Sequence, residues 1–229
     1  YGLDAAEFLE PASSFRTFNE FFFRRLRPDV RPVDSAAEAV VFPADGRHLG
    51  FESLSAAEAF FAKGQRFDLG AFVADAALAR RYAGGAAVFS RLCPVDYHRF
   101  HYPVAGKVTG PQRIEGVLGS VNPIALRRRL AFLWENRRWL TEIQTERNGR
   151  VLMVEIGATN VGSVVYTGAP SGGGVMKGAE KGYFRFGGSA VMTLFEPGRV
   201  KLSEDLVAAR AEGLELYAKV GERMGCWTA

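Results

Sequence analysis

A strong β-hairpin signal lies in the stretch "AFLWENRRWLTEIQTERNGRVLMVEIGATNVGSVVY", residues 131–166, and it limits the folds open to this chain. The segments on either side of Asn148-Gly149 are predicted to be strands. Asn-Gly favours the tight turn that joins two antiparallel neighbours. The segment therefore predicts antiparallel sheet.

The rest of the chain favours a mixed fold. Short strand-like runs, closed by glycine or proline, follow one another from about residue 40 to 119, with a helical stretch around "LGAFVADAALARRY". Because helices are expected mainly in the amino-terminal third and at the carboxyl end, we predict α+β: a mainly antiparallel β-sheet core with amino-terminal helices packed on or beside it. We divide the chain into a helical region, 1–39, and a β-rich domain, 40–229.

The amino-terminal region is predicted to be helical from residue 4 to about residue 27, with Ser13 or Ser14 as the cap. Its apolar positions recur every three to four residues: Phe15, Phe18, Phe22 and Leu26. The string "FNEFFFRRLRP" places an apolar face beside a basic one. Such a helix either packs on the core, which is the default for amphipathic helices, or lies on a membrane surface.

The chain is basic, with a net charge of +4, and its arginines cluster at 24–25, 127–129 and 137–138. This charge suits an anionic partner such as phospholipid headgroups or nucleic acid. No nucleic-acid-binding module is recognisable, so we expect no nucleic acid partner. No apolar run reaches the ~18 to 20 residues that span a bilayer. The first residue is Tyr1, which leaves open what precedes it.

Histidine and cysteine offer few metal ligands. Cys93 and Cys226 lie far apart, and we expect two free thiols in a protein that faces the cytoplasm. His98 and His101 lie in "DYHRFH", where a separation of three places strand residues on opposite faces. Asp96 is the only obvious carboxylate beside them, whereas zinc sites use three or more protein ligands. We expect no metal and interpret both histidines as bases in a pocket.

Two glycines precede a serine in "GYFRFGGSAVMTLF". Glycine inside a strand often marks a place where another group approaches the backbone closely. Asp45 precedes a glycine in "PADGRH", and by itself an Asp-Gly pair indicates only a turn. Read together, Ser189, His101 and Asp45 could supply a nucleophile, its base and the carboxylate that orients the base. The sequence leaves open whether they meet in space.

Five strings occur in an order that resembles the phosphatidylserine decarboxylase family: "FNEFFFRRLRP", "FPADG", "DYHRFHYPVAG", "VEIGATNVGSV" and "KGAEKGYFRFGGS". The resemblance covers the chain from about Phe18 to Val200. It implies a proenzyme that cuts itself between Gly188 and Ser189 and converts Ser189 into a pyruvoyl group. By the same resemblance, His101 is the base for cleavage, Asp45 orients it, and His98 protonates the decarboxylated product.

The resemblance also implies the reaction and its partners. The pyruvoyl group would form a Schiff base with phosphatidylserine, and loss of carbon dioxide would give phosphatidylethanolamine. The small and large chains of one precursor would stay together in the β-rich catalytic domain, and a homodimer is one assembly that this allows. The enzyme would lie on the cytoplasmic side of a bacterial-type membrane. Its contacts with the anionic surface are expected from Phe18, Phe22, Arg24 and Arg25.

Two alternatives stay open: the first would share the cleavage motif, and the second follows from a departure from the family. Ala190 stands where the family usually has threonine or a second serine, so a hydroxyl that could orient the scissile peptide is absent. The first alternative is a pyruvoyl-type decarboxylase of a soluble amino acid. The second is an inactive, lipid-binding relative.

Overall fold

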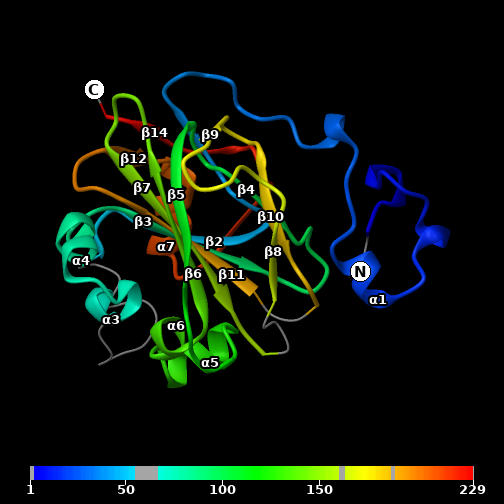
Figure 1. Ribbon diagram of the computed structural model, residues 1–229, viewed down its shortest axis with the longest axis horizontal. Coiled ribbons are helices and arrows are strands. Elements are labelled where there is room, and N and C mark those ends of the chain that lie inside the picture. The colour runs from blue at the N-terminus through cyan, green and yellow to red at the C-terminus, as the bar shows by residue number, and fades with distance from the viewer. Residues whose placement is uncertain (1–2, 55–66, 160–162, 187–188, 229) are drawn as a thin grey trace.

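A large antiparallel sheet forms the centre of the molecule (Figure 1). The computed structural model describes residues 3–54, 67–159, 163–186 and 189–228. Within them, eight strands are arranged in the order β13-β2-β3-β11-β7-β6-β5-β9, and all neighbours are antiparallel. Their bounds are β2 Gly46–Phe51, β3 Ala87–Leu92, β5 Gly106–Ile114, β6 Arg138–Gln144, β7 Arg150–Gly157, β9 Gly174–Val175, β11 Ser189–Phe195 and β13 Leu216–Ala218.

Two smaller sheets of three strands accompany the large one. Their orders are β1-β14-β12 and β4-β10-β8, and both are antiparallel. The bounds are β1 Ala39–Val41, β12 Val200–Leu202 and β14 Arg223–Trp227, then β4 Arg99–His101, β8 Val164–Tyr166 and β10 Glu180–Phe184. With the helices below, these sheets confirm the predicted α+β class.

Short helices surround the sheets. They are α1 Phe18–Phe22, α3 Leu69–Val73, α4 Ala76–Tyr82, α5 Pro123–Arg128, α6 Phe132–Glu135 and α7 Glu204–Ala211, with single 3-10 turns at Ala5–Glu7, Ala12–Ser14 and Pro28–Val30. The helical stretch predicted at 69–82 is present but broken. Ala74 adopts a left-handed conformation with φ of 52°, and Asp75 then caps α4 by accepting hydrogen bonds from the amides of Ala77 and Leu78.

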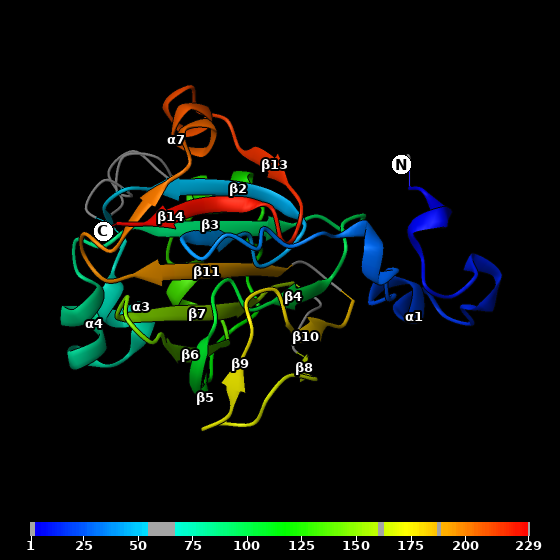
Figure 2. The ribbon, with the colours of Figure 1, turned by 90° about the horizontal axis from the view of Figure 1, so that it is seen from above.

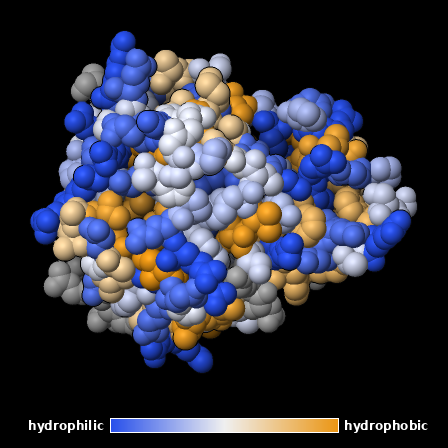
Figure 3. Space-filling view, viewed as in Figure 1, coloured by the Kyte–Doolittle hydropathy of each residue, from blue (hydrophilic) through white to orange (hydrophobic). Residues whose placement is uncertain are grey.

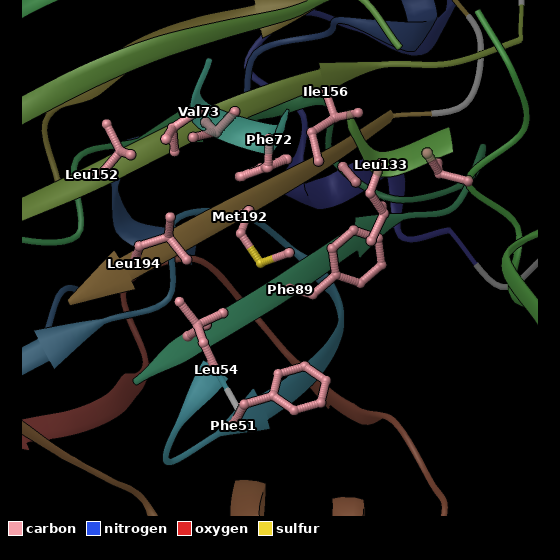
Figure 4. Packing of buried hydrophobic residues seen from close by; sticks show 14 of the residues in the cluster. Phe51, Leu54, Phe72, Val73, Phe89, Leu133, Leu152, Ile156, Met192 and Leu194 are labelled. Carbon is pink, nitrogen blue, oxygen red and sulfur yellow. The ribbon is translucent and has the colours of Figure 1, made fainter. Parts of the chain in front are cut away.

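Strand β11 divides the core because its side chains alternate between two faces. Met192 and Leu194 point into one cluster, where they lie near Phe72 and Phe89 (Figure 4). Val191 belongs to a different cluster, which includes residues of β4 and β10. The small β4-β10-β8 sheet therefore covers the face of the large sheet to which the odd-numbered residues of β11 belong.

The hairpin predicted at Asn148-Gly149 is confirmed. Strands β6 and β7 pair antiparallel on either side of it, from Gln144↔Arg150 to Arg138↔Ile156. Gly149 has a φ of 78°, a conformation that favours glycine. The hairpin places Gly157, the last residue of β7, opposite Ser189, the first residue of β11.

The amino-terminal region differs from the single helix predicted over residues 4–27. The α-helix is limited to α1, which begins after Thr17 rather than after Ser13 or Ser14. Thr17 and Glu20 form a capping box, in which each side chain accepts a hydrogen bond from the other residue's backbone amide. A β-bridge between Phe8 and Leu26 closes the segment on itself. Figure 2 shows this segment to one side of the stacked strands.

Candidate active site

Ser189 is the first residue of β11, at the end of the central strands. Its cross-strand partners are Leu92, the last residue of β3, and Gly157, the last residue of β7. The side chain is fully buried, and its hydroxyl has no hydrogen-bond partner in the described part of the chain. A buried hydroxyl without a partner is costly, and such groups often have a chemical role. The predicted cleavage partner, Gly188, lies outside the described residues.

His98 is held beside the segment that leads to Ser189. Its Nδ1 lies 2.9 Å from the carbonyl oxygen of Asp96, and its own carbonyl accepts a hydrogen bond of 3.0 Å from the amide of Phe184. The other ring nitrogen, Nε2, is buried and has no partner among the described residues. Burial, aided by the charge of Arg24, lowers the pKa of His98 to about 3. The imidazole is therefore neutral at physiological pH, with Nδ1 donating and Nε2 free to accept a proton.

His101, on β4, has the same pattern of contacts. Its Nδ1 lies 2.9 Å from the carbonyl oxygen of Gly178, while Nε2 is buried without a partner among the described residues. Its amide donates a hydrogen bond of 2.7 Å to the carbonyl of Pro43. Burial lowers the pKa of His101 as well, although the nearby carboxylates of Glu180 and Asp45 oppose the shift. A neutral imidazole with a free Nε2 has the protonation state that a general base requires.

Asp45 is buried, but its carboxylate has partners other than His101. Arg31 donates to it from Nη2 at 2.7 Å and from Nε at 2.9 Å, and the amide of Val220 donates to Oδ1 at 2.9 Å. The carbonyl oxygen of Gly178 takes the hydrogen-bonding position at His101 Nδ1, a position that the sequence analysis had assigned to Asp45. The described contacts thus bring Asp45 close enough to influence His101 electrostatically, without a hydrogen bond between them. The orienting role of Asp45 stays a prediction.

Aromatic rings form a cover over His98 that the sequence analysis did not predict. The Phe22 ring lies over the imidazole with 3.6 Å between ring centroids, and Phe186 lies against Phe22 at 5.2 Å. Phe18 packs edge-on against Phe186 at 5.0 Å. The amide of Phe186 also donates a hydrogen bond to Asn19 Oδ1. This bond joins α1 to Phe186, which lies three residues before Ser189. The order Phe18, Phe186, Phe22, His98 runs from the surface to the site.

Two residues expected at a membrane surface are not on the surface. Phe22 is fully buried against His98, and Arg24 is only 4% exposed. This corrects the expectation for both residues, because Phe22 packs on His98 and Arg24, which follows α1, donates to the carbonyls of Phe21 and Val95. Phe18 and Arg25 are exposed, and Arg25 pairs with Glu10. Figure 3 shows hydrophobic residues at the surface of this side of the molecule.

A buried ion pair joins the two sheets that enclose the site. Glu155 of β7 accepts a hydrogen bond of 2.5 Å from Lys181 of β10 and one of 2.9 Å from the hydroxyl of Tyr166 in β8. Glu155 and Lys181 are both almost completely buried. Sequence reasoning missed this pair, although a glutamate within the apolar string "VLMVEIG" was a signal that a partner was needed.

The described residues contain no group of three metal-ligating side chains, and Cys93 and Cys226 are free thiols. None of the helices in the described ranges has the length and apolar character needed to cross a membrane.

A buried hydroxyl and two imidazoles, each with one buried and unpartnered atom among the described residues, are the kinds of group that enzymes use for nucleophile and proton-transfer chemistry. The model of one enzyme family, described as phosphatidylserine decarboxylase, matches residues 18–226. The chain belongs to the phosphatidylserine decarboxylase family.

Individual relatives match almost the whole chain. The phosphatidylserine decarboxylase proenzyme of Chlamydia muridarum is 45% identical over 225 residues, which cover 98% of this chain and 74% of that protein. The proenzyme of Ruminiclostridium cellulolyticum is 39% identical over 225 residues, covering 98% and 75%. That of Chlamydia caviae is 43% identical over 222 residues, covering 96% and 73%.

Proposed function

We propose that this chain is a phosphatidylserine decarboxylase proenzyme, which cleaves itself before Ser189 and then converts phosphatidylserine into phosphatidylethanolamine and carbon dioxide. The observation that carries the proposal is the fully buried, unpartnered hydroxyl of Ser189 in a chain of this family. The relatives are named as proenzymes, which supports a processing step.

The chemistry of cleavage begins at the serine hydroxyl. Ser189 Oγ attacks the carbonyl carbon of residue 188, and His101 Nε2 accepts the hydroxyl proton. The C–N bond breaks, so that the peptide becomes an ester and residue 189 gains a free amine. Loss of the Cα proton then breaks the Cβ–O bond, and residue 188 leaves as a carboxylate. Addition of water and loss of ammonia complete the conversion of residue 189 into a pyruvoyl group.

The residues around position 189 fit such a group. The hydroxyl that would be consumed has no partner in the described structure, so its loss leaves no hydrogen-bond donor or acceptor stranded. A pyruvoyl carbonyl supplies an electron sink for decarboxylation of an amino acid headgroup. His98 Nε2 is also buried without a partner among the described residues, and we assign to it the transfer of the proton that replaces carbon dioxide. Because burial lowers the pKa of His98 to about 3, Nε2 carries no proton at rest and must accept one before it passes it to the product.

A lipid substrate requires contact with a membrane surface. Phe18 is 56% exposed and continues into the aromatic cover above His98, so it supports an apolar path from the surface to the site. Arg25 is exposed on the same amino-terminal segment, where it pairs with Glu10, and its charge would attract anionic headgroups. We propose that this side of the molecule contacts the membrane, with Phe18 and Arg25 retained from the residues that the sequence suggested.

Intact mass under denaturing conditions tests the proposal. The native chain should separate into residues 1–188 and 189–229, with a pyruvoyl group in place of Ser189, whereas Ser189→Ala should remain one chain. Carbon dioxide release from phosphatidylserine, with free L-serine as the comparison substrate, then tests the activity. Two fragments from Ser189→Ala would overturn the cleavage mechanism, and turnover of free serine alone would overturn the lipid substrate.

A further inference from the structure

A polar cavity of about 410 Å³ lies between the amino-terminal segment and the end of β3. Its lining combines four acidic and four basic side chains: Asp4, Glu7, Asp45, Asp96, Arg24, Arg31, Arg47 and Lys219. None of the steps proposed above uses Arg24 or Arg47.

The cavity adjoins the reactive end of β11. Ser189 pairs with Leu92, and the chain that continues from Leu92 folds around the cavity. The amide of Cys93 donates a hydrogen bond of 2.6 Å to the cavity residue Asp96. Asp96 in turn holds His98 through its carbonyl oxygen. Residues 92–98 thus connect the cavity lining to Ser189 and His98, although neither of these two residues lines the cavity itself.

The arginines in the cavity differ in how their charge is balanced. Arg31 makes ion pairs of 2.7 Å with Asp45 and 2.9 Å with Glu7. Arg24 is 4% exposed, yet no carboxylate of the described residues lies within ion-pair distance of it. Its guanidinium donates to the carbonyls of Phe21 at 3.3 Å and Val95 at 3.2 Å, and Nε has no partner there.

Asp45 and Asp96 act on Arg24 electrostatically and the rings of Phe8 and Phe21 pack against it, but no carboxylate of the described residues contacts it directly, and a bound anion would supply that contact. A guanidinium has five N–H donors, of which the two carbonyls use only part. Its planar arrangement of donors suits the oxygens of a phosphate particularly well. Arg47, whose side chain is 40% exposed, also lines the cavity, and its charge is paired with Asp96 at 3.7 Å.

We propose that Arg24 binds the phosphate of a single lipid headgroup inside this cavity, and so determines specificity for a phosphorylated substrate. The inference rests on the proposed function. In a phosphoserine headgroup only one methylene and one oxygen separate the phosphate from the reacting α-carbon, so the phosphate subsite must adjoin position 189. Arg24 thus changes from a residue expected to contact the membrane surface to one that recognises an individual substrate molecule.

The test uses the processed enzyme and two water-soluble substrates, short-chain phosphatidylserine and an O-alkylserine that lacks phosphate. Arg24→Gln should raise KM for the phospholipid and lower its kcat/KM by roughly tenfold or more, as expected for loss of a charge-assisted hydrogen bond. The kcat/KM for O-alkylserine should not change. The ratio of kcat/KM for the phospholipid to kcat/KM for O-alkylserine does not depend on the fraction of protein that is folded and processed. An unchanged ratio in Arg24→Gln would overturn the proposal.

Arg27→Gln is the matched control, because Arg27 lies on the same segment but is exposed and paired with Asp29. It removes the same charge and should leave the ratio unchanged. Arg24→Lys keeps the charge but loses the planar set of donors, and an intermediate ratio is expected. A decrease in Arg27→Gln as large as that in Arg24→Gln would indicate a general effect of charge and would overturn the assignment.

A second measurement does not depend on processing or activity. Calorimetry should detect glycerophosphoserine binding to the uncut Ser189→Ala chain and should detect none for Ser189→Ala/Arg24→Gln. Inorganic phosphate should compete with glycerophosphoserine, because both would occupy Arg24. Equal binding by the two chains, or inorganic phosphate that binds at Arg24 without competing, would overturn the headgroup assignment. If the native enzyme fails to decarboxylate phosphatidylserine while this binding persists, the proposed function fails and the anion site stands.

Discussion

Ser189, His98 and His101 share a property at the residue scale: each keeps one polar side-chain atom buried and unpartnered within the described chain. The two imidazoles are fixed through Nδ1 by backbone carbonyls, so Nε2 is the free nitrogen in both. Fixing one nitrogen sets the tautomer, and this allows each ring to act as a base without first losing a proton. The two rings differ in position, since Phe22 covers only His98.

Substitution of each histidine should therefore impair a different step of the reaction. His101→Ala should remain uncut, because Ser189 loses the base that accepts its proton, with a loss of roughly 100-fold or more in the cleavage rate. His98→Ala should be cut normally and then turn over phosphatidylserine poorly. Mass spectrometry after timed incubation, followed by carbon dioxide release, measures both steps. Normal cleavage of His101→Ala together with uncut His98→Ala would show that the roles are reversed.

The residues of the site were easier to predict than their contacts. Glycines before Ser189 and the short string around His98 and His101 were visible in the sequence, and the structure shows that Ser189, His98 and His101 each keep a buried atom without a partner among the described residues. The partner of Asp45 was not visible, because Arg31 competes for that carboxylate with two charge-assisted hydrogen bonds. Long-range competition of this kind depends on how the chain folds back on itself.

At the scale of elements, local signals succeeded where a turn or a cap decides the structure. Asn148-Gly149 gave the hairpin because glycine is suited to the positive φ found there. The helix predicted over 4–27 failed for a related reason. The capping box of Thr17 and Glu20 starts the helix later than Ser13 or Ser14 would, and the bridge between Phe8 and Leu26 turns the remaining segment back.

Helix α1 gives a prediction for membrane binding. Arg25→Gln should bind anionic vesicles about fivefold more weakly, since each basic residue near such a surface contributes about 1 kcal/mol. Phe18→Ser should weaken binding further by removing exposed apolar area. Sedimentation across a salt series measures both, with Lys201→Gln as a control at an exposed position on β12. Binding that is the same for all variants at every salt concentration would remove this surface from the proposal.

At the scale of the whole molecule, the ion pair between Glu155 and Lys181 holds the small β4-β10-β8 sheet against the large one. In the uncut Ser189→Ala background, Lys181→Met should lower the free energy of unfolding by ~3 to 5 kcal/mol, because it leaves a buried carboxylate without its cation. The double variant Lys181→Met/Glu155→Gln keeps an acceptor for Tyr166 and should recover most of that loss. Urea unfolding measures the difference. A double variant as unstable as the single one would show that packing, rather than charge, dominates.

His48 makes the stability of the molecule depend on pH. Its ring is fully buried between Ser90 and the carbonyl of Ala218, and burial lowers its pKa to about 3. An unfolded histidine has a pKa of ~6.5. Between these values the unfolded chain holds the proton and the folded chain does not, so stability is present above pH ~6.5 and is lost as pH falls.

The size of the His48 effect can be measured by substitution. Between pH 7.5 and 5.5, a histidine of this kind removes about 1.4 kcal/mol from the free energy of unfolding. In the Ser189→Ala background, His48→Gln should show a pH-dependent loss smaller by that amount, measured by urea unfolding at the two pH values. An identical loss in both chains would mean that His48 is not the group that titrates.

The aromatic cover over His98 also has a consequence for timing. Every group assigned to cleavage comes from one chain, Ser189 and His98 are fully buried, and Phe22, backed by Phe186, covers His98. Cleavage should therefore be a unimolecular, first-order reaction. Its half-time should be the same in dilute and concentrated protein, and with or without vesicles. The break before Ser189 would turn the segment that carries Phe186 into a free chain end, close to the ring of Phe22 that it packs against. A newly made chain should therefore turn over no lipid until cleavage is complete, even where it already binds the headgroup.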